Sequence, residues 1–278
     1  MSLIEARNLY HSYVLRSGDS VAALRDVSLA IEEGEYVAVV GANGSGKTTL
    51  ALHLNGILTP TSGQVLVGGR STSNPEEVRY IRSTVGMVFQ SPDDQLVATV
   101  VEEDVAFGPE NLGMAPARLE IVVREALERV GMWDERHRPP HQLSAGQKQR
   151  VAVAGAIAMN PRCLVLDEAT SMLDPAGTRD VIGIAEALHS EGMTIITVTH
   201  KMEEAARADR LLVLNAGTLV MDGSPAEVFG HPDLASWRLR PPAVSVLAAR
   251  LRLLVPALPS TVLDSETFAK ALMQTGGP

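Results

Sequence analysis

The chain has 278 residues, a formal net charge of -9 at pH 7 and a single cysteine, Cys163. This length can bury a large core and allows one large domain or two smaller ones. The acidic balance argues against a broad nucleic-acid-binding face, which needs clustered Lys and Arg, and one cysteine excludes an internal disulfide and fits a reducing compartment such as the cytosol.

The first forty residues are expected to form short strands. Turn signals interrupt them at residues 17–19 and 32–34, and residues 64–67, between two glycines, are typical of a further strand. These segments predict a β-rich flank. Glu5 and Arg7 lie where a signal peptide would be apolar, and no apolar run approaches the roughly 18 to 20 residues that span a bilayer. A membrane role would therefore depend on a partner.

Residues 39–50, VVGANGSGKTTL, carry a glycine-rich motif of the form G-x-x-x-x-G-K-[ST] between an apolar run and a helical pattern. Its fixed positions are Gly41, Gly46, Lys47 and Thr48. Glycines let backbone N–H groups converge on phosphates, and the following helix adds its positive end. Lys47 would reach the β- and γ-phosphates, and the Thr48 hydroxyl would ligate Mg²⁺. The alternative is a plain glycine turn between a strand and a helix.

A second apolar run, at residues 85–89, predicts a strand that ends at Gln90. The Gln90 amide could meet Mg²⁺ or an attacking water there, although its position alone does not decide the role. Residues 117–130 and 147–159 then carry apolar residues at helical spacing, with two prolines at 139–140 between them. Together they predict a helical insertion over residues 91–160.

The segment LSAGQ, at residues 143–147, opens the second of these helices. Ser144 is expected to be the N-cap, and together with Gly146 it leaves exposed N–H groups that make a second anion-binding helix end. One triphosphate does not need two such ends from distant parts of one chain. The pattern therefore predicts a dimer in which this end of one subunit closes on the phosphates of the other.

Acidic and basic groups follow the next two apolar runs. Asp167 and Glu168 end the run that starts at residue 163, where an open α/β sheet binds its ligands. Asp167 suits Mg²⁺, whereas Glu168 points a different way because side chains alternate along a strand, and can address an attacking water. His200 ends the run at 194–199, beside the γ-phosphate. The alternatives are a surface strand end for the two acids and a structural histidine.

The carboxyl-terminal half alternates strands and helices. Apolar runs at 163–166, 194–198 and 211–214 are typical of buried parallel strands, in the same sheet as the phosphate loop. Beyond residue 231, two prolines precede helical patterns at 243–253 and 266–273. They indicate a small C-terminal appendage.

In order and spacing, GANGSGKT, Gln90, LSAGQ, CLVLDE, SMLD at 171–174 and His200 resemble the ATP-binding cassette (ABC) ATPases over about residues 2–230. The resemblance implies an α/β, P-loop NTPase fold with a RecA-like parallel-sheet core, an antiparallel β flank, a helical insertion subdomain and a small C-terminal appendage. It implies an ATP-binding domain at 2–231 and a dimerisation appendage at 232–278.

The resemblance also implies roles for single residues. Glu168, His200 and Gln90 would be catalytic, Thr48, Gln90 and Asp167 would hold Mg²⁺, and Asp174 would belong to the D-loop. The implied ATP-binding residues are Tyr13, Gly41, Asn43, Gly44, Ser45, Gly46, Lys47, Thr48 and Thr49. The implied signature residues, which act on the other subunit's nucleotide, are Ser144, Ala145, Gly146 and Gln147.

Two of these positions need comment. Tyr13 would stack on adenine in the family, although from the sequence alone it reads as a strand residue. Ala145 stands where the family signature usually has Gly, so its methyl group could crowd the phosphate.

Within the family, residues 89–95 and 104–111 look like the ATPase subunits of energy-coupling factor (ECF) transporters. Residues 145–161 and 168–175 look most like the CbiO type. ECF transporters take up vitamins and metal ions such as cobalt or nickel. Gln95 would contact the groove for the coupling helix of the transmembrane protein, the alternative being a solvated loop glutamine. The cargo is chosen by a separate membrane protein, so this sequence carries no information on it.

The resemblance therefore implies an ATPase subunit on the cytoplasmic face of the cell membrane, with ATP and Mg²⁺ as ligands. Its implied partners are a second ATPase, identical or paralogous, a transmembrane T component and a substrate-binding S component, with no nucleic acid. One rival is the ATPase of an ordinary importer with a soluble substrate-binding protein. Another is a soluble, non-transport ABC protein, but such chains usually carry a long coiled coil or two cassettes joined by a basic linker.

Overall fold

The computed structural model describes residues 2–259 and 262–275, and its centre is a six-stranded sheet in the order β10-β9-β3-β8-β7-β6. The strands are β3 (Tyr36–Val40), β6 (Val85–Val88), β7 (Cys163–Asp167), β8 (Thr194–Val198), β9 (Arg210–Asn215) and β10 (Thr218–Gly223). All neighbours are parallel except β9 and β10, which form an antiparallel hairpin. The expected parallel core, with the phosphate loop on one of its strands, is confirmed.

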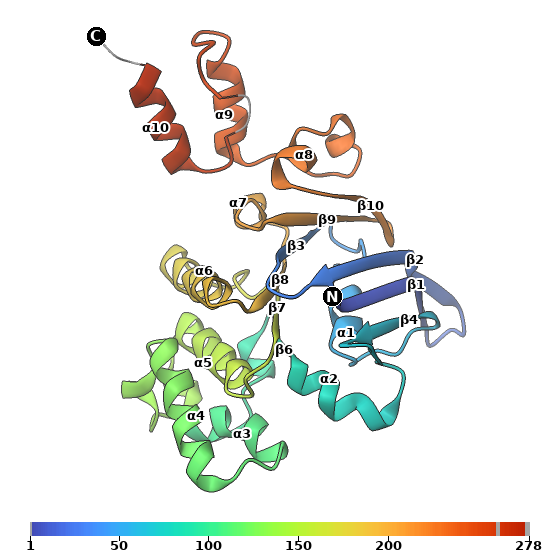
Figure 1. Cartoon of the computed structure of the whole chain (residues 1–278), viewed down its shortest axis with the longest axis vertical. Coiled ribbons are helices and arrows are strands. Elements are labelled where there is room, and N and C mark those ends of the chain that lie inside the picture. The colour runs from blue at the N-terminus through green and yellow to red at the C-terminus, as the bar shows by residue number, and fades with distance from the viewer. Residues whose placement is uncertain (1, 260–261, 276–278) are drawn as a thin grey trace.

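Helices cover both faces of this sheet (Figure 1). They are α1 (Lys47–Leu54), α5 (Ala145–Ile157) and α6 (Pro175–Ser190). Because side chains alternate along a strand, Ala38 and Val40 of β3 join the core cluster under α5 and α6, whereas Val37 and Val39 join the cluster around α1. Burial on both faces explains why these strands read as continuous apolar runs.

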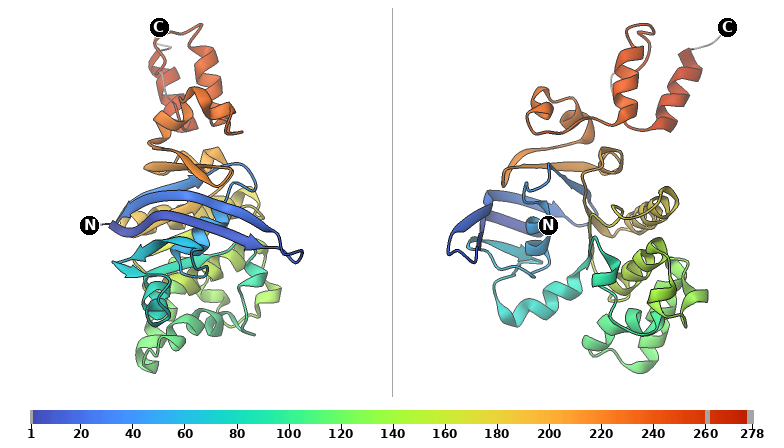
Figure 2. Two further views of the ribbon diagram at one scale, coloured as in Figure 1. Left: turned by 90° about the vertical axis from the view of Figure 1, so that its right-hand side faces the viewer. Right: turned by 180° about the vertical axis from the view of Figure 1, so that it is seen from behind.

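A second sheet, antiparallel and in the order β2-β1-β4-β5, forms the expected flank beside α1 (Figure 1). Its strands are β1 (Ser2–Val14), β2 (Ser20–Glu32), β4 (Ser62–Val67) and β5 (Arg70–Ser71). The expectation of short strands is wrong for β1 and β2, which have 13 residues each and run side by side as a long ribbon (Figure 2). Register shifts, one of them between Ala6 and Leu9, interrupt the alternation that would mark such a long strand.

The helical insertion follows β6. Two elements precede that strand, η1 (Pro75–Glu77) and α2 (Val78–Thr84). Between β6 and α5 lie η2 (Pro92–Asp94), α3 (Val101–Asn111), α4 (Pro116–Arg129), η3 (Trp133–Glu135) and η4 (Pro140–Gln142). The two helices predicted for this region correspond to α4 and α5, and the two prolines at 139–140 fall between them, so the expected insertion is confirmed.

The remaining elements follow β8 and β10. They are α7 (Met202–Ala205), α8 (Pro225–Phe229), η5 (Pro232–Ala235), α9 (Ala243–Leu251) and α10 (Ser265–Thr275). The last two helices pack around a small core of their own, formed by Ala248, Leu258, Val262 and Phe268. They lie at the opposite end of the molecule from α3 and α4 (Figures 1 and 2).

The predicted division of the chain at 231/232 stays a prediction about function. In terms of packing, Leu234, Trp237 and Leu239 still belong to the main core, so the second core starts only beyond Leu239. Of the predicted appendage, residues 260–261 and 276–278 lie outside the described residues. Within the described ranges, no helix is both long and apolar enough to cross a membrane.

His53 of α1 makes the stability of this fold depend on pH. Its ring is fully buried and lies 4.7 Å from the ring of His11, centroid to centroid. Burial first, and then the neighbouring His11, lower the pKa of His53 from 6.5 to about 4. Between these values the unfolded chain binds more protons than the folded chain, so the stability that a neutral His53 provides above pH 6.5 is lost as the pH falls toward 4.

We therefore expect the free energy of unfolding of His53→Leu to depend less on pH below pH 6.5 than that of the wild type. The loss in the wild type should reach about 3 kcal/mol by about pH 4, measured as the free energy of unfolding in urea. His141→Leu, at an exposed histidine, serves as the control and should follow the wild type. Parallel curves for wild type and His53→Leu would show that His53 does not cause the dependence.

Candidate nucleotide-binding and catalytic site

The parallel strands deliver the predicted site residues to one edge of the sheet. Gln90 follows β6, Glu168 follows β7, His200 follows β8, and the glycine loop follows β3. In the register, Asp167 is paired with Val198, and Val198 with Val39. The expectation that the strand of Asp167 neighbours the strand that leads to His200 is confirmed. Segments far apart in the sequence thus meet at the carboxyl edge, where open α/β sheets bind ligands.

The glycine loop needs glycine for its close contacts. Gly46 is the N-cap of α1 with φ +104°, and a Cβ there would lie 2.6 Å from the carbonyl oxygen of Ala23 on β2. A glycine cap has no side chain, so the first N–H groups of α1 are available to an anion. Asn43 and Gly44 are exposed at the tip, whereas Ser45 is buried.

Lys47 lies along the inside of this loop. Its ammonium donates to the carbonyl oxygens of Gly41 (3.0 Å) and Ala42 (3.3 Å), and its side chain is largely buried. Burial lowers the pKa of Lys47, while the nearby Glu168 and Asp167 carboxylates act in the opposite direction. The cation therefore stands between the loop and the two acids, where it would meet a phosphate.

Thr48 and Asp167 form the candidate Mg²⁺ site. The Thr48 hydroxyl donates to Asp167 Oδ1 at 3.2 Å. Burial raises the pKa of Asp167 to about 6, with the Glu168 charge adding to this and the Thr48 hydrogen bond and Lys47 opposing it. Two hard oxygen ligands from separate elements fit Mg²⁺, which usually takes one or two protein ligands and completes its shell with phosphates and water. Gln90, the third predicted ligand, is exposed at the end of β6.

Glu168 and His200 face each other beyond the strand ends. His200 Nδ1 lies 3.5 Å from Glu168 Oε1. The side chains of Asp167 and Glu168 point in different directions as predicted, the first to Thr48 and the second to His200. The expected reason for this is wrong. Strand alternation does not act here, because β7 ends at Asp167 and Glu168 has left-handed backbone, φ +48°. Such a conformation is rare for a residue other than glycine and is found where function demands it.

The signature segment caps α5 as expected. The Ser144 hydroxyl accepts from the Gln147 N–H (3.2 Å), and Gln147 Oε1 accepts from the Ser144 N–H (2.9 Å), which closes a capping box. Ser144 and Ala145 are exposed, so their surface is open to another molecule. The side-chain oxygen of Gln147 is used within the cap, and its predicted role toward the other subunit's nucleotide stays a prediction.

The predicted D-loop residue Asp174 lies at the start of α6, which packs against the start of α5. Asp174 is the N-cap of α6 and accepts from the Gly177 N–H at 2.7 Å. A Cβ on Gly146 would be 3.4 Å from Gly177 Cα, so α5 and α6 begin in contact. A displacement of the start of α5 would therefore push against the start of α6.

Tyr13 lies on β1, as its pattern suggested, with 40% of its surface exposed. Its hydroxyl is 3.2 Å from Thr49 Oγ1, and its ring meets the edge of His11 with centroids 4.6 Å apart. These contacts hold a partly exposed aromatic ring next to the phosphate loop, an arrangement that suits stacking on a base.

Two glutamine side chains make contacts to the main chain around Phe89 that the sequence did not predict. Gln149 of α5 is fully buried and donates to the Phe89 carbonyl at 3.1 Å. Gln95 accepts from the Phe89 N–H at 3.0 Å and donates to the Met87 carbonyl at 3.2 Å. The only hint in the sequence is a glutamine inside an otherwise apolar helical face. Since both ends of the Gln95 amide are used, this side chain positions the loop, and its predicted docking role stays a prediction.

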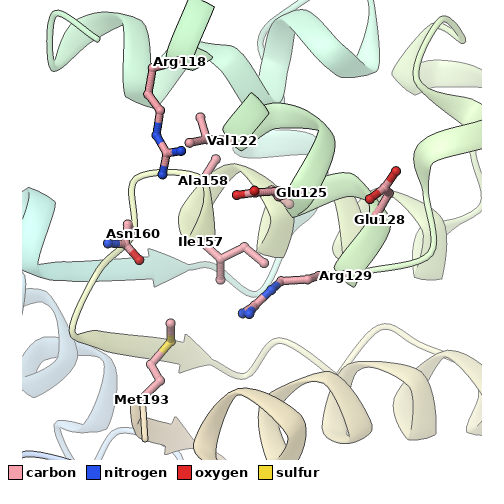
Figure 3. A pocket seen from close by; sticks show the side chains of 10 residues that line it. Arg118, Val122, Glu125, Glu128, Arg129, Ile157, Ala158, Asn160 and Met193 are labelled. Carbon is pink, nitrogen blue, oxygen red and sulfur yellow. The ribbon is translucent and has the colours of Figure 1, made fainter. Parts of the chain in front are cut away.

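A pocket of about 650 Å³ lies between α4, the end of α5 and the segments that precede β7 and β8, away from the residues described above (Figure 3). It is lined by charged residues of α4 such as Arg118 and Arg129, together with Asn160 and Met193, which precede β7 and β8. It therefore opens at the amino ends of the strands, opposite the edge that carries the predicted site.

Comparisons with known proteins agree with this geometry. Residues 24–171 match the ABC transporter family. The chain is 50% identical over 278 residues to the energy-coupling factor transporter ATP-binding protein EcfA1 of Symbiobacterium thermophilum, covering 98% of this chain and 96% of that protein. CbiO1 of Clostridium perfringens, part of the ABC transporter complex CbiONQ, is similar in structure with a TM-score of 0.75, 32% identity, and coverage of 92% of this chain and 96% of that one.

A further solved structure is a dimer. The ATP-binding cassette MJ0796, in a post-hydrolysis state with ADP and Pi, has a TM-score of 0.72 and 28% identity, covering 80% of this chain and 98% of that one.

The raised pKa of Asp167 gives a prediction for stability without ligands. Between the ordinary value of 3.8 and about 6 the folded chain binds more protons than the unfolded chain, so stability falls as the pH rises through this window. We expect Asp167→Asn to be more stable than the wild type above about pH 7, by on the order of 3 kcal/mol, with the gain gone below about pH 4. Urea unfolding at several pH values measures it.

Asp180→Asn is the control for this prediction, because Asp180 is a half-exposed partner of Arg150. The difference in free energy of unfolding between Asp180→Asn and the wild type should not grow as the pH rises from 4 to about 6. An Asp167→Asn variant that is less stable than the wild type at every pH would contradict the assigned cost of burying this carboxylate.

Proposed function

The chain belongs to the ABC transporter family and, within it, to the energy-coupling factor transporter ATP-binding proteins, and on this premise we propose that it is the ATP-hydrolysing subunit of an ECF-type importer. The observation that carries the proposal is the meeting of the loop, the Thr48–Asp167 pair and the Glu168–His200 pair at one sheet edge. Each of these groups has a defined task in phosphoryl transfer to water.

The phosphates of ATP would lie in the loop of residues 41–48. Backbone N–H groups at the start of α1 and the Lys47 ammonium would balance their charge, and Tyr13 would stack on the base. Thr48 and Asp167, with Gln90 from the neighbouring strand, would hold Mg²⁺. When bound, this ion would help to neutralise the negative charge that develops on the phosphates.

Glu168 is the proposed general base. Its carboxylate accepts the proton of the attacking water, and His200, 3.5 Å away, fixes the carboxylate on one side and reaches toward the γ-phosphate on the other. The carboxylate of Asp167 is tied to Thr48, so the two neighbouring acids keep separate tasks.

The exposed start of α5 would complete the site of a second subunit, a copy of this chain or a paralogue. Ser144, Ala145 and Gly146 would address the γ-phosphate across the dimer interface, with Asp174 beside them. The dimer of the MJ0796 cassette supports this arrangement. Because both subunits must close to complete either site, hydrolysis becomes linked to a change of shape.

A groove of about 730 Å³ between the core and the helical insertion is the proposed docking site for the transmembrane T component. It is lined by Val78 of α2, Met87 of β6 and Phe107 of α3, together with Phe89 and Leu112, which directly follow β6 and α3. Phe107 is 54% exposed, a large apolar surface that a short helix of the T component would cover. Phe89 lies in the same groove and directly precedes Gln90, so an occupant would contact the strand end that carries a site residue.

The whole assembly would then be a peripheral ATPase pair on the cytoplasmic face of a membrane, with a T component and a substrate-binding S component in the bilayer. ECF-type importers of this build would carry vitamins or metal ions such as cobalt or nickel. The S component alone would contact the cargo.

Two variants test hydrolysis. Glu168→Gln should keep ATP affinity and lose hydrolysis by ~10²-fold or more, the usual effect of a positioned base, and should accumulate as an ATP-bound dimer in size-exclusion chromatography. Lys47→Ala should instead lose ATP affinity tenfold or more, since a charge-assisted contact contributes roughly 1.5 to 3 kcal/mol. Wild-type turnover in Glu168→Gln would place the base elsewhere.

A second test addresses docking. Phe107→Glu should weaken assembly with co-purified membrane chains about tenfold or more, because burying a large apolar side chain contributes roughly 1.5 to 3 kcal/mol, while ATP hydrolysis by the ATPase dimer alone stays within about twofold. Ile121→Glu is the matched control, since Ile121 is an exposed residue of α4 (46%) outside the groove. Equal assembly of both variants with the membrane chains would remove this groove from the proposal.

A further inference from the structure

A buried cluster of polar side chains lies directly behind the catalytic edge. The Thr170 hydroxyl donates to Glu204 Oε1 at 2.7 Å, and the Thr199 hydroxyl donates to Glu204 Oε2 at 3.1 Å. Lys201 Nζ lies 3.1 Å from Glu204 Oε1 and also donates to the Thr170 carbonyl at 2.9 Å. Thr170, Thr199 and Glu204 are all less than 9% exposed. One carboxylate oxygen of Glu204 thus accepts from the turn that contains Thr170, and the other accepts from the turn that contains Thr199.

These two turns carry the proposed catalytic pair. Thr170 follows Glu168 by two residues, and the Ser171 N–H donates to the Glu168 carbonyl at 3.0 Å, which makes the segment a closed turn. Thr199 directly precedes His200, and its hydroxyl also accepts from the Lys201 N–H at 3.0 Å. A shift at either threonine would therefore move the adjoining catalytic side chain.

The sheet itself does not fix the distance between these turns. The β7–β8 register ends at Asp167 and Val198, and the last main-chain bond between the two segments is that from Glu168 N–H to the Val198 carbonyl, 2.9 Å. Beyond it, Thr199 N–H bonds to Val39 on the other neighbour, β3. Toward β7, apart from the 3.5 Å approach of His200 to Glu168 itself, the described contacts between the two turns are those of Glu204 and Lys201.

Stability alone does not explain this cluster. Burying the Glu204 carboxylate costs desolvation energy, its partner Lys201 is only partly buried, and an apolar replacement of similar volume is often as stable or more so. A satisfied polar cluster does, however, select a single geometry.

We propose that Glu204 is a positioning residue for hydrolysis. Through Thr170 and Thr199 it holds the turns of Glu168 and His200 at the separation that the reaction needs. The inference rests on the proposed function, and it concerns the chemical step, because small misplacements of reacting groups lower the rate while leaving nucleotide contacts intact.

Isosteric variants of the two threonines test the proposal in the full-length chain, assembled with its partner ATPase where the active dimer contains one. Thr170→Val and Thr199→Val should each lower kcat by about tenfold to a hundredfold and leave KM for ATP within about twofold. Thr197→Val is the matched control. Thr197 is also buried, in β8, but its hydroxyl bonds to the Tyr36 hydroxyl (3.4 Å) rather than to Glu204, and both constants should stay near those of the wild type.

Substitution of Glu204 and a double variant separate positioning from folding. Glu204→Gln retains hydrogen-bonding capacity and should keep more activity than Glu204→Leu. In a Glu168→Gln background, Thr199→Val should cause no further loss of rate and should leave the ATP-bound dimer intact, whereas a folding defect would reduce the dimer.

The proposal is overturned if Thr170→Val and Thr199→Val hydrolyse ATP at the wild-type rate, or if they lose activity only together with ATP affinity and dimer formation. Its failure is distinct from that of the proposed function. A wild-type protein that does not hydrolyse ATP would remove the proposed function, whereas an active wild type that Glu168→Gln inactivates, with unaffected threonine variants, would remove only the role of Glu204.

Discussion

The parallel register of β6, β7, β8 and β3 is the constraint on which the rest of the structure depends. Parallel pairing sends like ends of the strands to the same edge, and burial of both faces fixes that pairing, because a slip of one residue would exchange the two core clusters. Gln90, Glu168, His200 and Lys47 come from separate parts of the chain and meet there. The chemistry of the edge is thus a result of strand order and core packing.

The same edge collects features that are unfavourable by themselves. Asp167 is a buried carboxylate, Lys47 a largely buried ammonium, and Glu168 has a left-handed backbone. None of them would be selected for stability. The two large core clusters offset these costs, and the fold holds the groups in place so that a ligand with complementary charge finds them already arranged.

The sequence predicted those parts that local patterns determine. Buried strands, the phosphate loop, Ser144 as N-cap and the helical insertion follow from apolar periodicity and turn chemistry. Contacts between distant segments leave no such pattern, and for this reason the bonds of Gln149 to Phe89 and of Glu204 to Thr170 were missed. Gln95 was predicted as a docking residue, but its two bonds to the neighbouring main chain were not. The conformation of Glu168 was also out of reach, because tertiary hydrogen bonds hold it. The packing boundary beyond Leu239 depends on which core Trp237 and its neighbours join, and a break in composition does not report that.

Both main-chain groups of Phe89 are hydrogen-bonded to glutamine side chains. Its N–H donates to Gln95, and its carbonyl accepts from Gln149. Gln149 belongs to α5, whose first residues are the predicted signature, so hydrogen bonds connect the groove residue Phe89 to the helix that begins at the predicted signature. Thermodynamic linkage then requires reciprocity. If closure of the dimer raises the affinity of the groove for its occupant by some factor, the occupant raises the equilibrium constant of dimer closure by the same factor. A cassette built in this way would let the state of its membrane partner set how readily ATP draws the two subunits together.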